Sequence, residues 1–352
     1  MIKLNETPVR TARNFNINNI KLENIEIPEK LDFFQNANIC IESSKDEVVL
    51  SQSDTKLTYG LGEFFTNQVI KNSNYSLTVN VNSKMKKLIM IDFEFDKSNL
   101  NLVENILINA KEGTKSTIVI KYKAEENLKC FHNGIIKVKA EKNSEINIIF
   151  ANLLNTESNN FISIENELLE NAKVQWTIID LGGKNSISNY YSNVLGKSAN
   201  NELNAIYLGK ENQIFDLNYI GELRGEKSNV NFEVQGALKD SSKKHFKGTI
   251  DFKRGSKKSK GNENEACMLL SDKARSLSLP MLLCSEEDVE GNHSTSSGKI
   301  GDKELFYIMS RGFDEKAAMK LMVRAKFNKI LETIQIPELK NEILYEIDKR
   351  LD

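Results

Sequence analysis

The sequence predicts an all-β core folded as a right-handed parallel β-helix, a solenoid, with a small C-terminal α-helical region. Three observations predict this fold class. Short segments of alternating apolar and polar residues dominate from about residue 70 to about residue 300. These segments recur at a nearly constant spacing, with no helical pattern between them. The last forty or so residues change to apolar positions three and four residues apart, which is typical of helices.

Five windows of eight residues carry the repeat. They begin at residues 115, 143, 171, 200 and 227, so their starts lie 28, 28, 29 and 27 residues apart. The fourth, sixth and eighth positions of every window are apolar or aromatic, and alternation with period two places each trio on one face of a strand. These positions are Ile118, Ile120 and Tyr122; Ile146, Ile148 and Phe150; Val174, Trp176 and Ile178; Leu203, Ala205 and Tyr207; and Val230, Phe232 and Val234.

A second alternating piece lies between successive windows, beginning at Gly134, Asn160, Asn185 and Asn212. Each repeat therefore supplies two strands separated by polar turns. One such coil cannot bury its apolar face alone, so the coils must stack and pair their backbones in parallel ladders. Asn and Gly suit the corners because both tolerate left-handed backbone conformations. An antiparallel sandwich has similar short strands, but the near-constant spacing favours the β-helix.

The chain divides into three expected regions. Residues 1–70 form a mixed N-terminal lead-in, residues 71–305 the β-helix core and residues 306–352 the helical region. Within the lead-in, residues 53–72 are compatible with a short helix or a turn.

Two helices are expected in the C-terminal region. The first begins near Phe313 with Asp314 as its N-cap, and the second begins at Glu338 after a break at Pro337. Because the open ends of a stacked sheet need cover, the helices are expected to cap the β-helix. The same helices are compatible with a docking surface for another subunit.

Composition excludes several function classes. The 352 residues contain 48 Lys and Arg against 49 Asp and Glu, and this balance argues against a nucleic-acid binder. No run of 18 or more apolar residues occurs, so no membrane span is expected. The N-terminus lacks an apolar signal core, which predicts a cytoplasmic protein. The four cysteines include no CxxC pair, which speaks against a zinc knuckle or a disulfide framework.

The sequence lacks the short motifs of common enzyme chemistry, so a non-catalytic protein is expected. It contains no HExxH, no GxxxxGK[ST] and no GxSxG motif. His132 is interpreted as structural and His245 as an exposed residue of a basic loop. Cys267 and Cys284 lie in apolar runs, and a buried core position is expected for both.

The C-terminal third contains segments that resemble a known family. They read HFKGTIDF from residue 245, MLLSDKA from residue 268, LPMLL from residue 279, DVEGNHSTSSGKI from residue 288 and LFYIMSRG from residue 305. Together they are similar to the C-terminal part of the SufB/SufD family of the SUF iron–sulfur cluster assembly system. Earlier pieces of the chain also fit, so the resemblance covers most of the sequence.

The resemblance implies a right-handed parallel β-helix and a scaffold role. A SufB-like subunit would pair with the chain through the β-helices, and a SufC-like ATPase would bind the C-terminal helices. An iron–sulfur cluster would form transiently at the shared interface, with none held tightly by the isolated chain. The implied ATPase contacts are Phe306, Arg311, Gly312, Phe313, Met319, Met322 and Phe327.

Within the family, the chain is most similar to SufD. Ala274 stands where SufB has a functional cysteine, and Ser294 stands where SufB has an acid. His293 matches the histidine that SufD places at the interface, which implies that His293 is a metal ligand in an Fe–S site shared with the partner subunit. Neutral imidazole can ligate iron.

Two other functions remain open from the sequence. One is a β-helix carbohydrate-active enzyme that carries paired carboxylates along the solenoid. The other is a SufB-like scaffold that pairs with itself, which the absence of a cysteine at Ala274 disfavours.

Overall fold

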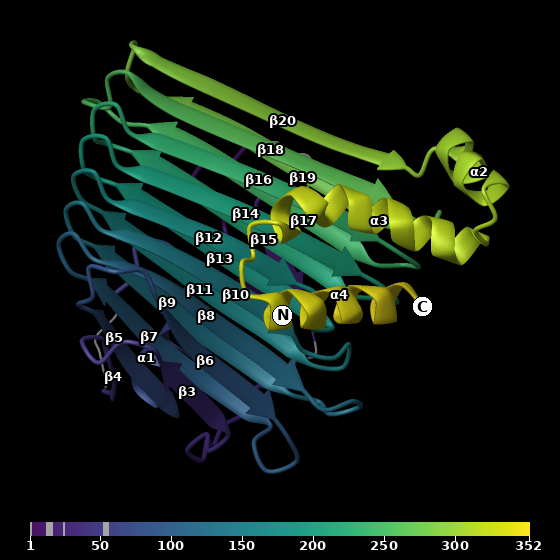
Figure 1. Ribbon diagram of the computed structural model, residues 1–352, viewed down its shortest axis with the longest axis horizontal. Coiled ribbons are helices and arrows are strands. Elements are labelled where there is room, and N and C mark those ends of the chain that lie inside the picture. The colour runs from purple at the N-terminus through teal and green to yellow at the C-terminus, as the bar shows by residue number, and fades with distance from the viewer. Residues whose placement is uncertain (1, 12–16, 24, 52–55) are drawn as a thin grey trace.

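The computed structural model describes residues 2–11, 17–23, 25–51 and 56–352, and its core is a parallel β-helix of two nine-stranded sheets (Figure 1). From β5 onward the chain crosses from one sheet to the other at every half-turn, so consecutive strands lie in opposite sheets. The first sheet contains β20 (Val289–Lys299), β18 (Ser259–Leu269), β16 (Asn229–Leu238), β14 (Asn200–Gly209), β12 (Lys173–Asp180), β10 (Glu145–Leu153), β8 (Lys115–Ala124), β6 (Lys87–Phe95) and β3 (Ala37–Ile41). The second contains β19 (Arg275–Cys284), β17 (Lys243–Phe252), β15 (Ile214–Leu223), β13 (Asn185–Val194), β11 (Asn159–Leu168), β9 (Phe131–Ala140), β7 (Asn101–Ala110), β5 (Tyr75–Val81) and β4 (Glu47–Leu50).

The predicted solenoid and the inward face of its strands are confirmed, but the register differs from the spacing of the windows. All fifteen repeat positions are buried. Ile148 pairs with Ile118 on one side and with Trp176 on the other, and Trp176 pairs with Leu203. The sequence windows instead aligned Ile118 with Ile146. A shift of two residues preserves the face of a strand, so alternation alone could not detect it.

Left-handed residues mark the corners of the coils, as expected. Asn127, Asn143 and Asn171 have positive φ, but so do residues with longer side chains such as Glu211 and Lys227. Several corners also carry a Ser or Thr hydroxyl that donates to the carbonyl three residues earlier, which closes the turn locally. These hydroxyls belong to Thr114, Ser144, Ser228, Ser242 and Ser256.

A chain of buried polar side chains lies among the apolar residues of the interior. The Tyr122 hydroxyl donates to the Glu104 carboxylate, and the His132 imidazole lies between Glu104 and Asn160. Asn160 donates to the Ser186 hydroxyl at 3.0 Å, and Ser186 donates to Asp180 at 2.8 Å. His132 is therefore structural, as expected. Each of these side chains has at least one polar partner, as buried polar side chains usually do.

The N-terminal region covers the outer face of the second sheet. β1 (Ile2–Leu4) pairs antiparallel with β2 (Ile20–Leu22), and α1 (Glu63–Asn72) packs on β7 and β9. Part of the ambiguous segment 53–72 is thus a helix, and its residues 53–55 lie outside the described residues. The apolar contacts of this layer include Leu4, Leu61, Phe65, Val69, Phe131 and Phe161.

The last two helices cover the outer face of the first sheet and do not cap the end of the stack, which corrects the expected capping role (Figure 1). Asp314 is the N-cap of α3 (Glu315–Leu331), as predicted. Its carboxylate accepts a hydrogen bond from the Ala317 amide at 2.7 Å. α4 begins at Pro337 and ends at Leu351. The helices lie along the side of the stack because outward residues there are apolar, including Val119, Ile149, Ile179 and Ile206.

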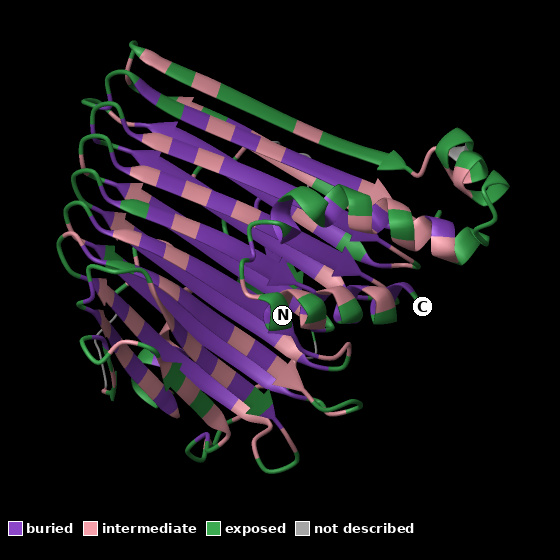
Figure 2. Cartoon of the chain, viewed as in Figure 1, coloured by how far each residue is buried: buried purple, intermediate pink, exposed green. Residues whose placement is uncertain are grey.

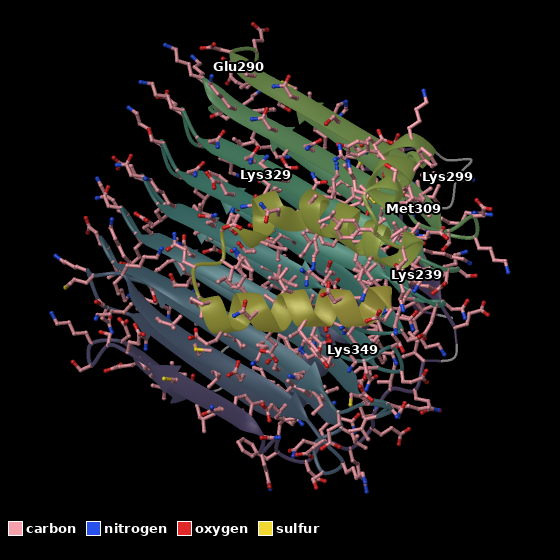
Figure 3. The ribbon with its side chains drawn as sticks, turned by 45° about the vertical axis from the view of Figure 1, so that its right-hand side comes forward. Lys239, Glu290, Lys299, Met309, Lys329 and Lys349 are labelled. Carbon is pink, nitrogen blue, oxygen red and sulfur yellow. The ribbon has the colours of Figure 1, made fainter. Side chains whose placement is uncertain are left out.

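Polar contacts also hold these two helices against the β-helix (Figure 3). Lys329 Nζ lies 3.0 Å from a Glu233 carboxylate oxygen, and Lys239 Nζ donates to the Leu351 carbonyl at 3.1 Å. None of the helices in the described ranges combines the length and apolar character needed to cross a bilayer.

We expect Gly236→Ala to lower the free energy of unfolding by about 1–3 kcal/mol, because overpacked cores are strained. A Cβ at Gly236 would come within 1.8 Å of the Tyr207 ring. The urea midpoint at constant m-value measures the effect. Gly298→Ala is the matched control, since nothing lies within 4 Å of its Cβ position. Equal midpoints for the two variants would contradict the packing described here.

We expect stability to fall as pH rises toward 7 because of Asp180. Burial raises the pKa of Asp180 to about 7 despite bonds from Ser186 and Asn152. Between about pH 4 and pH 7 the unfolded chain releases this proton while the folded chain keeps it, which costs up to about 1.4 kcal/mol per pH unit. Asp180→Asn should flatten that slope in urea titrations at successive pH values. Between about pH 5 and pH 7 the exposed Asp272→Asn should leave the slope unchanged, because Lys299 lowers the pKa of Asp272 and this carboxyl group is ionised throughout that range.

Candidate functional site: the open end of the β-helix

The C-terminal end of the β-helix is an uncovered pair of strand edges. β19 and β20 are the last strands of their sheets, and no strand in the described part of the chain pairs with their outer edges. Most residues of β20 are exposed, whereas the strands beneath it are mostly buried (Figure 2). An open edge presents unpaired backbone N–H and C=O groups, so it is a template for another chain.

His293 lies on the inward face of this last coil. It pairs in register with Glu263 of β18, which in turn pairs with the core residue Phe232 of β16. His293 is nevertheless exposed, because its coil has no further coil stacked upon it. The position that buries an aromatic ring two coils below thus presents an imidazole at the end of the stack.

Glu263 forms part of the floor beneath His293. Its side chain is 2% exposed, and in the described residues neither carboxylate oxygen has a hydrogen-bond partner. The carboxyl group occupies the space over Gly248, where a Cβ would approach Glu263 Cδ to 2.2 Å. Burial, and then the charge of Glu265, raise the pKa of Glu263 to about 8. This buried acid was not found from the sequence, where it stands among many surface acids.

A satisfied ionic cluster fills the rest of the floor. Glu265 accepts from Tyr207 at 2.8 Å and from Ser278 at 3.0 Å, and its ion pair with Lys244 measures 2.8 Å. Cys267 lies beside this cluster, and burial raises the pKa of its thiol. A thiol with a raised pKa is a poor nucleophile and ligand, so the buried structural role expected for Cys267 is confirmed.

Two sequence interpretations near this end were wrong. Cys284 is exposed rather than buried, because it ends the edge strand β19. The basic segment around His245 is not a loop but strand β17, and its Lys244 and Lys247 are buried in ion pairs with Glu265 and Asp216. His245 itself is largely buried, and its side chain is 23% exposed. Charge counts could not show this pairing because the partners are distant in sequence.

An exposed apolar surface follows directly after β20. The sequence did not delimit the short helix α2 (Asp302–Ser310), which carries Phe306 with 73% of its surface exposed. Arg311 stacks over Tyr307, and Gly312 is exposed in a left-handed conformation. We call this surface the α2 patch, and its exposed apolar members are Phe306, Tyr307, Met309, Phe313 and Leu321 (Met309 is labelled in Figure 3).

The residues implied as ATPase contacts therefore separate into two groups. Phe306, Arg311, Gly312 and Phe313 are exposed. Met319 and Met322 are half-buried, and Phe327 is fully buried against the first sheet, so it is unavailable to a partner in this arrangement. Tyr307, Met309 and Leu321 are exposed apolar residues that the sequence analysis did not select.

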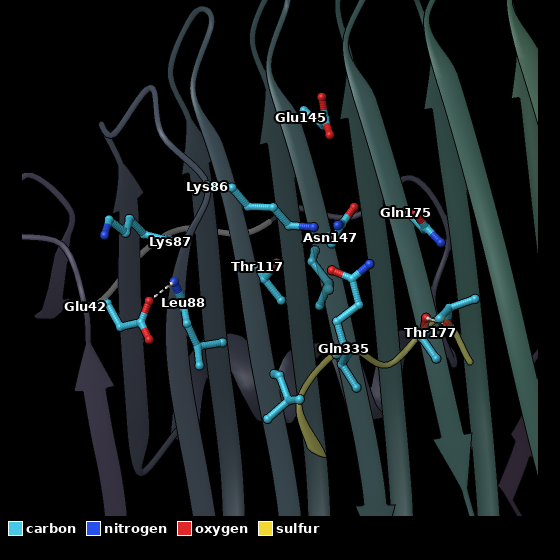
Figure 4. Close-up of a pocket in the computed structure, with 14 residues that line it drawn as sticks. Glu42, Lys86, Lys87, Leu88, Thr117, Glu145, Asn147, Gln175, Thr177 and Gln335 are labelled. Atoms are coloured by element: carbon cyan, nitrogen blue, oxygen red, sulfur yellow. Dashed lines mark hydrogen bonds between the residues drawn. The ribbon is translucent and has the colours of Figure 1, made fainter. Parts of the chain in front are cut away.

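A groove of about 560 Å³ lies on the outer face of the first sheet, where a carbohydrate chain could be held (Figure 4). Its polar lining includes Thr117, Asn147 and Gln175, which form one row across β8, β10 and β12. The acids of its lining are engaged: Glu42 accepts from the Leu88 amide at 3.1 Å and Glu145 pairs with Lys115 at 3.1 Å. A glycosidase needs two carboxyl groups facing one bond, so the groove does not support that alternative.

Comparison with known proteins shows which sequences this chain is similar to. Residues 93–326 match the family described as SUF system FeS cluster assembly, SufBD core domain. The chain is 22% identical over 282 residues, 80% of its length, to the iron–sulfur cluster assembly protein SufD of Bacillus subtilis. It is 31% identical over 251 residues, 62% of its length, to an iron–sulfur cluster assembly SufBD family protein of Pyrococcus horikoshii. The matches span 64% and 54% of those two relatives.

Proposed function

The chain belongs to the SufBD family of the SUF system, and we propose that it is a SufD-like, non-catalytic scaffold subunit for iron–sulfur cluster assembly. The observation that carries the proposal is the open end of the β-helix, where edge strands, His293 and the α2 patch follow one another along the chain. Each of these three features fits one step of assembly.

The edges of β19 and β20 would pair with a SufB-like subunit. Two edge strands from another β-helix would satisfy the free backbone groups, and the small polar side chains of β20 would allow close approach. A SufB-like identity for this chain, pairing with itself, is disfavoured because Ala274 is a buried residue without a thiol.

A SufC-like ATPase would bind the α2 patch. The patch consists of large exposed apolar side chains on and after α2, a helix that contacts α3, and exposed apolar surface of this kind marks protein interfaces. Because α2 is joined to β20 through Ile300 and Gly301, movement of α2 on ATP hydrolysis in the partner would be transmitted to the strand that bears His293.

The cluster would form between the paired subunits with His293 as one ligand. In the described residues no group of three or more His, Cys, Asp and Glu side chains could hold a metal. The remaining ligands would therefore come from the SufB-like subunit or from sulfide. The iron and sulfur are cargo of the complex in this proposal.

Coexpression of the chain with SufB-like and SufC-like proteins tests the assembly. We expect all three to copurify, and we expect Phe306→Asp to lose the ATPase while keeping the SufB-like subunit. A charge in place of a central aromatic anchor costs about 2 kcal/mol or more, about thirtyfold in Kd. Tyr345→Asp is the control, since Tyr345 is 65% exposed on α4, outside the patch. Loss of the ATPase from both variants alike would reject the α2 patch as its site.

We expect His293→Ala to lower the amount of cluster formed in the reconstituted complex about tenfold or more, because a metal ligand is lost. Visible absorbance and bound iron and sulfide measure the cluster. Asn292→Ala, at the neighbouring exposed position of β20, should form the cluster normally. Normal cluster formation by His293→Ala would remove the ligand role and leave the pairing proposal standing.

A further inference from the structure

We propose that Glu263 is the inner ligand of an Fe²⁺ site at the open end of the β-helix, with His293 as the outer ligand. This inference rests on the proposed function, because it assumes that iron is the cargo of this end of the molecule. It assigns a role to a buried acid that the assembly of the subunits does not require.

The backbone places the two side chains side by side. Glu263 and His293 are direct partners in the parallel ladder between β18 and β20. Paired residues of neighbouring strands lie about 4.8 Å apart in the ladder and point to the same face of the sheet. Both therefore face the interior column, with the imidazole forming the outer layer above the carboxyl group.

The carboxyl group of Glu263 is available for a ligand. It is almost fully buried, yet in the described residues both of its oxygens lack a hydrogen-bond partner. Such groups are uncommon because leaving them unpaired is costly. Glu265 on the same strand is the internal comparison, since Lys244, Tyr207 and Ser278 engage both of its oxygens.

The surrounding residues make room for this acid. The facing strand carries Gly248, and a Cβ there would lie 2.2 Å from Glu263 Cδ. In the layer above, several inward positions carry small side chains, whereas Pro280 pairs with Gly248 in the ladder and the Leu282 side chain lies beside Gly291. The small residues are Gly291, Thr295 and Ser297 of β20 and Ser276 and Ser278 of β19.

The donor set selects the cation. When the carboxyl group of Glu263 gives up its proton to an incoming cation, its oxygen beside a neutral imidazole nitrogen suits Fe²⁺ and related divalent transition metals. Two protein ligands leave coordination positions open for sulfide, water or a thiolate from the paired subunit. An anion is disfavoured as the ligand, because the unpaired group beneath His293 is the carboxyl group of Glu263.

The test is anaerobic equilibrium dialysis of the full chain against Fe²⁺. We expect the wild-type chain to bind iron, and Glu263→Gln and His293→Ala to weaken binding about tenfold or more. Glu290→Gln is the matched control: Glu290 is an exposed acid of β20 paired with Lys260 at 2.9 Å, and its variant should bind as the wild type does. Gln preserves the shape of an uncharged Glu263, and thermal unfolding verifies that the variant is folded.

The outcomes separate this inference from the proposed function. Iron binding by Glu263→Gln at wild-type affinity, or no binding by the wild type, overturns the role of Glu263. Weakened iron binding by folded Glu263→Gln that still copurifies with its SufB-like and SufC-like partners supports it. Failure of the wild-type chain to copurify with any such partner would instead count against the proposed function, whatever the iron measurements show.

Discussion

The structure depends on the requirement that every coil bury its inward face against the next coil. The repeated ladder places Ile118, Ile148, Trp176, Leu203 and Phe232 in one column, and each pairs with its neighbour in register. Continuous burial of such a column supplies the hydrophobic stabilisation that a single coil cannot obtain. The same requirement cannot be met by the final coil, which has a neighbour on one side only.

The core changes its chemistry as the column approaches that end. Beyond Phe232 the next two positions are Glu263 and His293, and the adjacent column passes from Val234 to Glu265 and Thr295. An apolar column would leave an exposed apolar surface here and invite nonspecific association. Polar side chains on an open end instead favour a specific partner, and under our proposal Glu263 and His293 would also bind iron. At the last coils, inward positions that apolar residues would fill for stability are therefore occupied by polar residues suited to a partner.

Both flanking regions protect the sides of the stack and leave the end free. The N-terminal layer covers the second sheet, and α3 and α4 cover the first. Parallel sheets need both faces covered because their side chains are apolar on both sides. With the sides closed, the edges of β19 and β20 and the α2 patch are the surfaces on which the proposed partners would assemble (Figure 1).

The sequence by itself determined the features that depend on local pattern. Alternation identified the inward trios, spacing identified the solenoid, and Asp314 identified the start of α3, because each signal lies within a few residues. Tertiary structure decided what depends on residues far apart in the chain. The register, the burial of Lys244 and Lys247 in ion pairs, the exposure of Cys284 and the side-on position of the C-terminal helices all belong to this class. The isolation of Glu263 does too, since a buried carboxyl group is recognised only when its neighbours in space are known.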